Sequence, residues 1–289
     1  MSIERINLMS FRSMRGPLRG AFVAALLAAV GLVSAASAQA SPLPTLTLTI
    51  TKSSITVAGA TQSGAVNVVT TATGVKEASA ILFLLKPGAT FEEVEAAIQK
   101  AHGEINVTSK YGSLVFDAEV TPGHTNEAQT YLQPGQYVAV VPGEEGKGSR
   151  AHALFTVTAA ASPVALPAPQ ATIRSIEFGF QGPSTLHDGE LVRFENEGFL
   201  VHMDVAAPVK NMKAAKQAVK DLLAGKEKAV GKLISGPPAG FAGPLSHEAF
   251  QQETITAKPG IYVEVCFMDT QDGRSHSRLG MERIIKITK

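Results

Sequence analysis

Short stretches in which apolar and polar residues alternate recur along the chain and predict β-strands. They are rich in Val, Ile, Thr and Phe, and clusters of Gly, Pro, Asn and Asp separate them. Examples are TLTLTITKSSITVAG, AVNVVTTATG and GQYVAVVPG in the first half, and ATIRSIEFGF, ELVRFENEG and GIYVEVCFM in the second. Strands at this spacing are typical of antiparallel sandwiches. The pattern therefore predicts an all-β protein.

One segment with helical periodicity interrupts the strand pattern in each half, at 90–102 and at 211–230. In the second segment, apolar residues recur at helical spacing and are expected to pack on the sandwich. These residues are Met212, Ala215, Val219 and Leu222 or Leu223. The stretch that follows, SGPPAGFAGPLSH (235–247), is rich in Gly and Pro, so we expect a mobile loop there.

The two halves repeat each other. TTATGVKEA (70–78) aligns with FENEGFLVH (194–202), and LQPGQYVAVV (132–141) aligns with AKPGIYVEVC (257–266). Between the halves lies AAASPVALPAPQA (159–171), which has no charged residue and is typical of an extended linker. The sequence thus predicts two tandem Greek-key β-sandwich domains, each with a helical insertion.

The predicted domains span 41–158 and 172–289, and the residues before them resemble a cleaved leader. Residues 1–40 contain four arginines, an apolar run over 21–33 and small residues that fit a cleavage site, which is the pattern of a signal peptide. We therefore expect a periplasmic or secreted protein. A retained membrane anchor is the alternative, although the apolar run is shorter than the ~20 residues that a spanning helix needs.

The charge of the mature chain gives no sign of a nucleic-acid partner. Without residues 1–40, 22 basic and 24 acidic side chains remain, a formal charge of −2. No later segment is long and apolar enough to span a membrane.

The candidate chemistry lies in the second copy. Cys266 is the only cysteine of the chain, and His276 and Met281 follow it. In the alignment of the two halves, Cys266 corresponds to Val141, and His202 corresponds to Ala78. The first copy therefore shows that the fold itself does not require these side chains.

At these residues the second copy resembles the cupredoxins, the superfamily that includes plastocyanin, azurin and the type 1 copper domains of copper nitrite reductases. In that family one histidine follows an N-x-G turn, as His202 follows FENEG, and Cys, His and Met come in that order after a PG-x-Y strand, as Cys266, His276 and Met281 do. The resemblance implies a Cys266 thiolate, equatorial imidazoles from His202 and His276, and an axial thioether from Met281. One copper ion, used for electron transfer or copper holding, would be the cofactor.

The spacing between Cys266 and His276 is longer than in plastocyanin or azurin. The insert contains an Asp-Gly turn at Asp272–Gly273, which predicts a hairpin tip that returns His276 to the metal. The alternative is a metal-free binding module, in which Cys266 is a small buried hydrophobic residue and Met281 a core residue.

Catalysis has little support in the sequence. The seven histidines form no His-x-His pair of the kind that a trinuclear copper cluster needs, and no Gly-x-Ser-x-Gly elbow appears. His187 and His247 are expected on the surface, with a supporting role near the metal as an alternative. His102, His124 and His152 receive no function.

Lysines gather on the second helical segment and predict a basic outer face, with only Asp221 and Glu227 as acidic residues. They are Lys210, Lys213, Lys216, Lys220, Lys226, Lys228 and Lys232. Such a face is commonly just solvated. The alternative is a docking surface for an acidic redox partner, because complementary charge speeds encounter.

Overall fold

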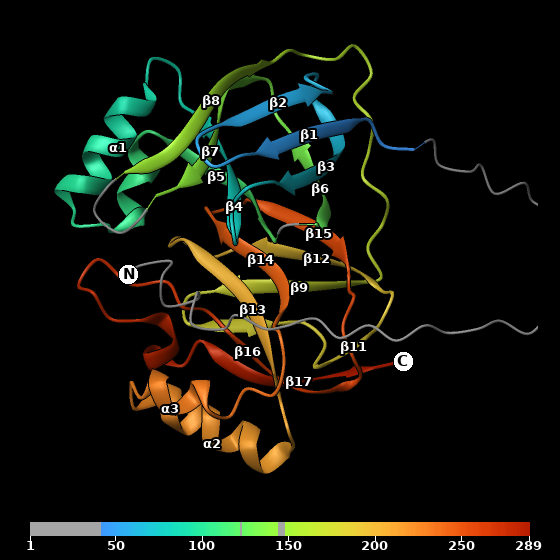
Figure 1. Ribbon diagram of the computed structural model, residues 1–289, viewed down its shortest axis with the longest axis vertical. Helices are drawn as coiled ribbons and strands as arrows, with labels where there is room; N and C mark the ends of the chain where they lie inside the picture. The colour runs from blue at the N-terminus through green and yellow to red at the C-terminus, as the bar shows by residue number, and fades with distance from the viewer. Residues whose placement is uncertain (1–41, 122, 144–147) are drawn as a thin grey trace, which may run out of the picture.

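The computed structural model describes residues 42–121, 123–143 and 148–289, and the expected signal peptide, residues 1–40, lies outside them. The described part of the first half has eight strands, one α-helix and one 3-10 helix (Figure 1). In chain order they are β1 (Thr45–Ile50), β2 (Ile55–Gly59), β3 (Gly64–Ala72), β4 (Ala78–Leu85), α1 (Phe91–Lys100), η2 (Ile105–Lys110), β5 (Gly112–Val120), β6 (Thr125–Leu132), β7 (Gly135–Pro142) and β8 (Ser149–Val157).

The second half repeats the eight strands, adds a short strand, β11, and contains two α-helices and one 3-10 helix. Its elements are β9 (Ala171–Ile176), β10 (Gly179–Gln181), β11 (Thr185–His187), β12 (Leu191–Asn196), β13 (His202–Val209), α2 (Met212–Leu223), α3 (Glu227–Gly231), β14 (Ala239–Leu245), β15 (Phe250–Thr254), β16 (Gly260–Val265), η3 (His276–Leu279) and β17 (Glu282–Thr288). Among the described residues, no helix is both long and apolar enough to cross a membrane.

Each half is a sandwich of two sheets, and the strand order is the same in both. The order β2-β1-β3-β6 of the first half recurs as β10-β9-β12-β15, and β5-β4-β7-β8 recurs as β14-β13-β16-β17. One pair of strands is parallel at the same place in both halves, β1 with β3 in the first and β9 with β12 in the second. The expected tandem β-sandwich architecture with helical insertions is confirmed.

The alternation of apolar and polar residues explains the sandwiches, because successive side chains of a strand point to opposite faces. In β1 the sequence TLTLTI buries Leu46, Leu48 and Ile50 completely, and its threonines stay partly or fully exposed. Two separate apolar clusters result, one between the sheets of each sandwich. The alignment of the halves also holds in the structure. Ala78 is the first residue of β4, as His202 is of β13. Val141 comes as many residues after Gly135, the start of β7, as Cys266 comes after Gly260, the start of β16.

The helical insertions begin at capping residues. In α1, Thr90 and Glu93 form a capping box, and in α2 the Asn211 side chain accepts a hydrogen bond from the N–H of Ala214. Ala215 and Leu222 of α2 are buried against the second sandwich and Val219 packs there partly buried, as the periodicity predicts, and Ala218, which the prediction did not include, is buried as well. The expectation was wrong for Met212, which lies in the first turn and is 44% exposed, and Leu223 is exposed as well.

The expectation of a mobile loop over 235–247 was also wrong, because β14 occupies most of it. This strand pairs with β13 at the edge of its sheet, and an edge position tolerates Pro244 because no partner strand requires a donor on its outer side. β14 faces β5 of the first sandwich, where the Ser246 N–H donates to the Leu114 carbonyl oxygen and the Leu114 N–H donates to Ser246 Oγ.

The two sandwiches pack on each other and share one sheet. β15 pairs with β6 at Gln252 and Gln129, so that the eight strands from β10 to β2 form a continuous sheet across both halves. Gln251 binds the Asp117 N–H and carbonyl oxygen of β5 through its side-chain amide. The segment between β8 and β9 follows this junction, and its Pro167 carbonyl oxygen accepts a hydrogen bond from Gln252. The two sandwiches are therefore joined by direct contacts as well as by the segment that connects them.

Candidate metal centre

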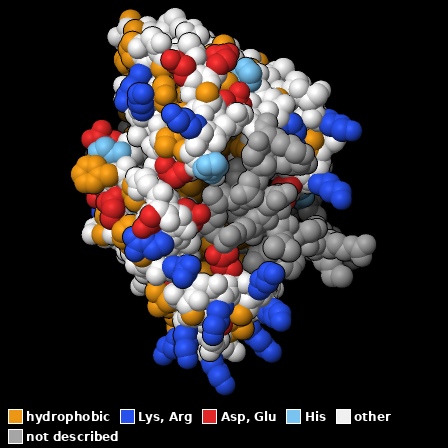
Figure 2. Space-filling view, turned by 90° about the vertical axis from the view of Figure 1, so that its left-hand side faces the viewer, with side chains coloured by type: hydrophobic (Ala, Val, Ile, Leu, Met, Phe, Trp, Pro, Cys, Tyr) orange, Lys and Arg blue, Asp and Glu red, His pale blue; other side chains and the backbone are white. Residues whose placement is uncertain are grey.

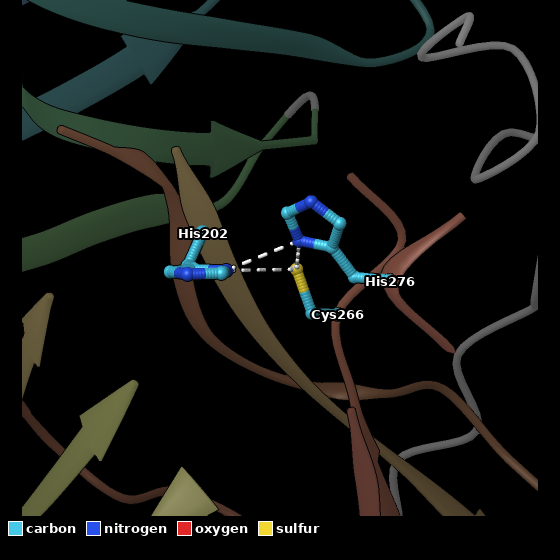
Figure 3. A group of neighbouring side chains, drawn as sticks. All are labelled: His202, Cys266 and His276. Atoms are coloured by element: carbon cyan, nitrogen blue, oxygen red, sulfur yellow. Dashed lines mark hydrogen bonds between the residues drawn. The ribbon is translucent and has the colours of Figure 1, made fainter. Parts of the chain in front are cut away.

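Three of the side chains singled out in the second copy, His202, Cys266 and His276, lie together (Figure 3), and Met281 shares a buried cluster with Cys266. Their neighbours Val201 and Met268 pack against residues of the first half, so the group lies at the end of its sandwich that faces the first. His202 is the first residue of β13, Cys266 follows β16, His276 begins η3, and Met281 precedes β17. All four are buried, and Cys266, His276 and Met281 are 0% exposed. Neighbouring strands of one sheet thus bring together residues that are far apart in the sequence.

The nitrogen and sulfur atoms of three of these residues form a small triangle (Figure 3). His202 Nδ1 lies 3.1 Å from His276 Nδ1, and Cys266 Sγ lies 3.4 Å from His276 Nδ1 and 3.9 Å from His202 Nδ1. Among the described residues this is the group of His, Cys, Asp and Glu side chains that could hold a metal ion.

The triangle fits a single type 1 copper ion. Imidazole nitrogen and thiolate sulfur bind metals at ~2.0–2.3 Å, so two such atoms on one trigonal ion lie about 3.5–4 Å apart. The observed edges are close to this range. Two imidazoles and one thiolate in a plane, with a weak thioether on the axis, are the donor set that suits copper in both oxidation states.

Met281 belongs to the apolar cluster that surrounds the thiol. Met203, Cys266 and Met281 form its buried part, and Phe178, Phe180, Val205, Phe267 and Met268 pack against it. The Cys266 N–H donates to the Met281 carbonyl oxygen, which fixes the two residues beside each other. The Phe178 ring meets the His276 ring edge-on, with the centroids 5.2 Å apart. These contacts bury the thiol and place Met281 in the same apolar cluster.

The long segment between Cys266 and His276 folds back on itself, as the Asp-Gly turn predicts. The Thr270 N–H donates to the Arg274 carbonyl oxygen, and the Gly273 N–H donates to the Thr270 carbonyl oxygen. Gly273 has a φ of 79°, a left-handed conformation that glycine adopts at no steric cost. The His276 N–H then donates to the Met268 carbonyl oxygen, which returns the imidazole to the thiol.

Glu177 is a neighbour of the site that the sequence analysis missed. It lies at the tip of the β9–β10 hairpin, and its Oε1 is 3.6 Å from His202 Nε2 and accepts hydrogen bonds from the N–H groups of Phe199 and Leu200. A Cβ atom on Gly198 would lie 2.6 Å from both Glu177 Oε1 and His202 Nε2, so only glycine allows this approach. The nearby carboxylate favours a proton on Nε2, and Nδ1 is the nitrogen that faces Cys266 and His276.

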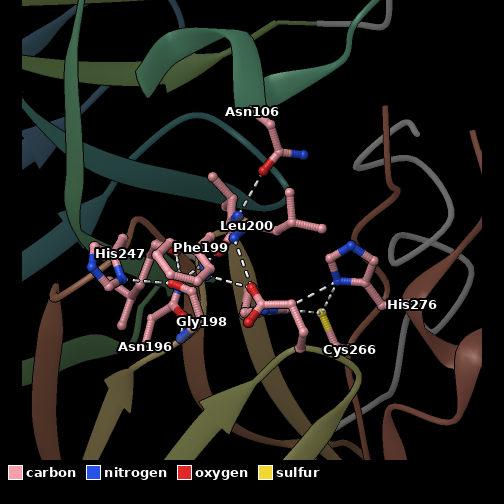
Figure 4. A network of polar contacts seen from close by, with 12 residues as sticks. Asn106, Asn196, Gly198, Phe199, Leu200, His247, Cys266 and His276 are labelled. Atoms are coloured by element: carbon pink, nitrogen blue, oxygen red, sulfur yellow. Dashed lines mark hydrogen bonds and ion pairs between the residues drawn. The ribbon is translucent and has the colours of Figure 1, made fainter. Parts of the chain in front are cut away.

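Asn196 fixes the turn that leads to His202. Its Nδ2 donates to the carbonyl oxygens of Leu200 and Leu245, and its Oδ1 accepts from the Gly198 N–H (Figure 4). These hydrogen bonds explain the N-x-G pattern of the sequence, Asn196 and Gly198, in the turn before His202. His247 is exposed, as expected, and binds the Gly198 carbonyl oxygen through Nδ1, at 2.8 Å.

Several other histidines lie away from the triangle. His187, on β11, binds Thr288 near the C-terminal end of the chain. His152 packs against Phe91 of α1 in the first sandwich. The structure brings neither of them to the buried donor group.

Burial sets the protonation of the donor atoms. It lowers the pKa of His202 to about 4, which the Glu177 charge partly opposes, and it lowers the pKa of His276 to about 3, with a contribution from His202. Burial also raises the pKa of the Cys266 thiol to about 12. At neutral pH the metal-free site therefore holds neutral imidazoles and a neutral thiol, so that metal binding must release the thiol proton and no imidazolium proton.

Two buried carboxyl groups lie next to the ligands in the sequence. Burial raises the pKa of Asp204 well above its usual range, and the charge of Glu264 adds to this effect. The Arg283 guanidinium donates to Glu264 and to the Gly182 carbonyl oxygen. The ion pair compensates the Glu264 charge, whereas neither carboxyl oxygen of Asp204 has a hydrogen-bond partner among the described residues.

Comparison of the sequence with protein-family models and with curated proteins gave no match. Comparison with solved structures gave weak similarities. Auracyanin from Roseiflexus castenholzii is 15% identical, over 41% of this chain and 95% of that chain, with a TM-score of 0.26. A copper-containing nitrite reductase from Thermus scotoductus SA-01 is 13% identical, over 86% and 69%, with a TM-score of 0.24. An azurin from Methylomonas sp. strain J is 12% identical, over 41% and 96%, with a TM-score of 0.26.

The class of the protein follows from its own fold and site. Two sandwiches repeat one strand order, and the second brings a histidine, a cysteine, a second histidine and a methionine together in the order of the cupredoxin superfamily. The chain therefore has a cupredoxin-like fold in two copies, of which the second carries a donor group that fits one type 1 copper ion.

The two buried imidazoles make the stability of the metal-free protein depend on pH. Their pKa values are lower in the folded protein than the ordinary 6.5, so the unfolded chain binds more protons below about pH 6.5. The stabilising contribution is complete above that pH and is lost as the pH falls towards 4. In urea unfolding with a chelator present, we expect a loss of a few kcal/mol over this range, since one pKa unit corresponds to about 1.4 kcal/mol.

The double variant His202→Gln/His276→Gln should lose this part of the pH dependence. The control variant His124→Gln, at an exposed position of the first sandwich, should keep it. Equal pH profiles for the double variant and the wild type would contradict the assignment of the effect to the buried imidazoles.

Proposed function

We propose that the protein is an exported copper protein that binds one ion in its second domain and uses it for electron transfer or copper holding. The observation that carries the proposal is the convergence of His202 Nδ1, Cys266 Sγ and His276 Nδ1 within a buried apolar cluster that includes Met281. The two imidazole Nδ1 atoms have each other and the thiol as their partners, and the thiol sulfur also accepts a hydrogen bond from the Met203 N–H. A bound soft metal ion would satisfy all of them.

In this proposal each side chain has a distinct role. Cys266 is the thiolate ligand, His202 and His276 are the equatorial imidazoles, and Met281 is the weak axial ligand. Copper in such a site exchanges one electron between its two oxidation states. The strands and hydrogen bonds fix the donor atoms, so these atoms should move little during the exchange. The apolar cluster excludes water. The first domain, which lacks these residues, is the metal-free copy.

We propose a non-catalytic role because the chain offers few further ligands. Among the described residues, the three-residue group of the second domain is the candidate metal site. A metal-free interaction module is the second candidate, and the burial of Cys266 and Met281 is the observation that favours it. Export is proposed from residues 1–40 and agrees with a lone cysteine that is buried, because a free exposed thiol is prone to oxidation outside the cytoplasm.

A basic surface on α2 and α3 suggests the kind of partner. All seven lysines of 210–232 are exposed, and they gather at the lower end of the molecule in Figure 2. Asp221 does not offset them at the surface, because it is buried and accepts a hydrogen bond from Gln217. Gly225, directly after α2, lies against Arg278 of η3, the helix that begins with His276. We propose that an acidic redox partner docks on this surface, which we call the lysine face.

Replacing Met281 by Leu tests the axial ligand. A thioether stabilises the oxidised ion more than an alkyl group does, so Met281→Leu should raise the reduction potential of the copper-loaded protein without abolishing copper binding. Protein-film voltammetry measures this potential. Met203→Leu is the matched control, because Met203 lies in the same cluster and is not assigned as a ligand. Equal potentials for both variants would rule out Met281 as the axial ligand.

Neutralising the lysine face tests the docking proposal. The triple variant Lys213→Gln/Lys216→Gln/Lys220→Gln should slow reduction of the copper-loaded protein by the anion hexacyanoferrate(II) about tenfold at low salt, because steering by charge is lost. Stopped-flow measurements over a range of ionic strength check this. Reduction by a cationic ruthenium hexaammine should not slow.

The matched control for the lysine face replaces three exposed lysines of the first domain, Lys52, Lys76 and Lys110, by glutamine. It removes the same net charge elsewhere. The docking proposal fails if this control slows the anionic reductant as much as the variant of the lysine face does, or if neither variant changes the salt dependence.

A further inference from the structure

The first domain contacts the two segments that carry the ligands of the second. Val201, which precedes His202, is 3% exposed and belongs to an apolar cluster whose other buried members all come from the first domain. Met268, on the segment between Cys266 and His276, packs against the same cluster. Two ligand-bearing segments of one domain are thus seated in the core of the other.

One polar side chain of the first domain binds both segments. Asn106 lies in η2, after the helical insertion of the first copy, and is 8% exposed. Its Oδ1 accepts a hydrogen bond of 2.7 Å from the Val201 N–H, and its Nδ2 donates one of 3.2 Å to the Asp269 carbonyl oxygen. Figure 4 shows Asn106 pointing from the first domain towards the network around Leu200, Cys266 and His276. The residues joined are 95 and 163 positions apart in the sequence.

The surroundings of Asn106 fix the direction of its amide. Glu104 Oε1 accepts hydrogen bonds of 2.6 Å from both the N–H and the Nδ2 of Asn106. A carboxylate and a carbonyl oxygen can only accept, so the NH₂ group must face Glu104 and Asp269, and the oxygen must face the Val201 N–H. Glu104, a residue of the first domain, therefore orients the Asn106 amide without any contact from the second domain.

We propose that the first domain completes the copper centre of the second, and that Asn106 is the positioning residue that holds the His202 segment and the Cys266–His276 segment at a fixed separation. This inference rests on the proposed function for the copper itself, and on the contacts of Asn106 for the positioning. Asn106 touches no metal ligand directly and acts through Val201 and Asp269. The first copy of the duplication, which lacks the metal-binding side chains, then has a defined role in the site.

The first test uses the metal-free protein, so that it does not depend on copper binding. In Asn106→Ala, hydrogen exchange of the Val201 amide should be about tenfold faster, because its buried acceptor is gone. Cys266 should also react faster with a thiol reagent, since its shielding segment is released. The matched control is Thr130→Val, which removes another hydrogen bond between the domains, from Thr130 Oγ1 to the Phe250 carbonyl oxygen. This control should leave both readouts at the wild-type values.

A second variant separates the two halves of the contact and serves if Asn106→Ala folds poorly. Asn106→Asp keeps an acceptor for the Val201 N–H but places a carboxylate oxygen against Glu104 and the Asp269 carbonyl oxygen, where a donor was. The segment around Asp269 should then exchange faster while Val201 stays protected. If Asn106→Asp matches the wild type at both segments, or if Thr130→Val changes them as much as Asn106→Ala does, the positioning role is wrong.

The second test uses the protein loaded with Cu(II). Asn106→Ala should shift the copper-thiolate absorption band and the reduction potential, whereas Thr130→Val should change neither. A wild-type protein that takes up no copper would overturn the proposed function and leave the hydrogen-exchange test of the contact in force. A copper-loaded Asn106→Ala with a wild-type spectrum and potential would overturn the positioning role and leave the proposed function standing.

Discussion

The burial of three donor atoms against one another is the constraint on which the arrangement of the candidate site depends. Two imidazole nitrogens and a thiol sulfur lie 3.1–3.9 Å apart in an apolar cluster, and burial keeps all three groups neutral at neutral pH. Burying polar atoms costs free energy unless they are satisfied, and apart from backbone hydrogen bonds to Cys266 Sγ these three atoms have only one another as partners among the described residues. A structure that retains such a group needs a rigid frame, and a metal ion would compensate the cost.

The two copies of the duplication contribute to that frame in different ways. Both copies have the same strand order, so the fold stands without ligands, as Ala78 and Val141 show at the positions of His202 and Cys266. The second copy places its donor group at the end that faces the first copy. There the first copy contributes apolar contacts to Val201 and Met268, and the shared sheet keeps the two sandwiches in one orientation. One copy thus carries the chemistry, and the other restrains the segments around it.

The sequence could predict the sandwiches and the four ligand candidates because each depends on local pattern or on order along the chain. Alternation predicts strands, and the repeat separates what the fold needs from what the second copy adds. The strand β14 escaped prediction, since its Gly- and Pro-rich sequence is typical of loops and only its pairing with β13 makes it a strand. Asn106 and Glu177 also escaped, because nothing near them in the sequence indicates the distant backbone N–H groups that they bind. Met212 follows the helical period and yet is 44% exposed, at the first position of α2.

The measurement that tests the central claim most directly is the visible absorption spectrum of the purified protein after addition of one equivalent of Cu(II), compared with that of Cys266→Ser. The account predicts an intense copper-thiolate charge-transfer band in the wild type and its complete loss in the variant, because Cys266 provides the only thiolate of the chain. A wild-type spectrum without this band, and no copper retained after dialysis, would contradict the account and leave a metal-free protein with a cupredoxin-like fold.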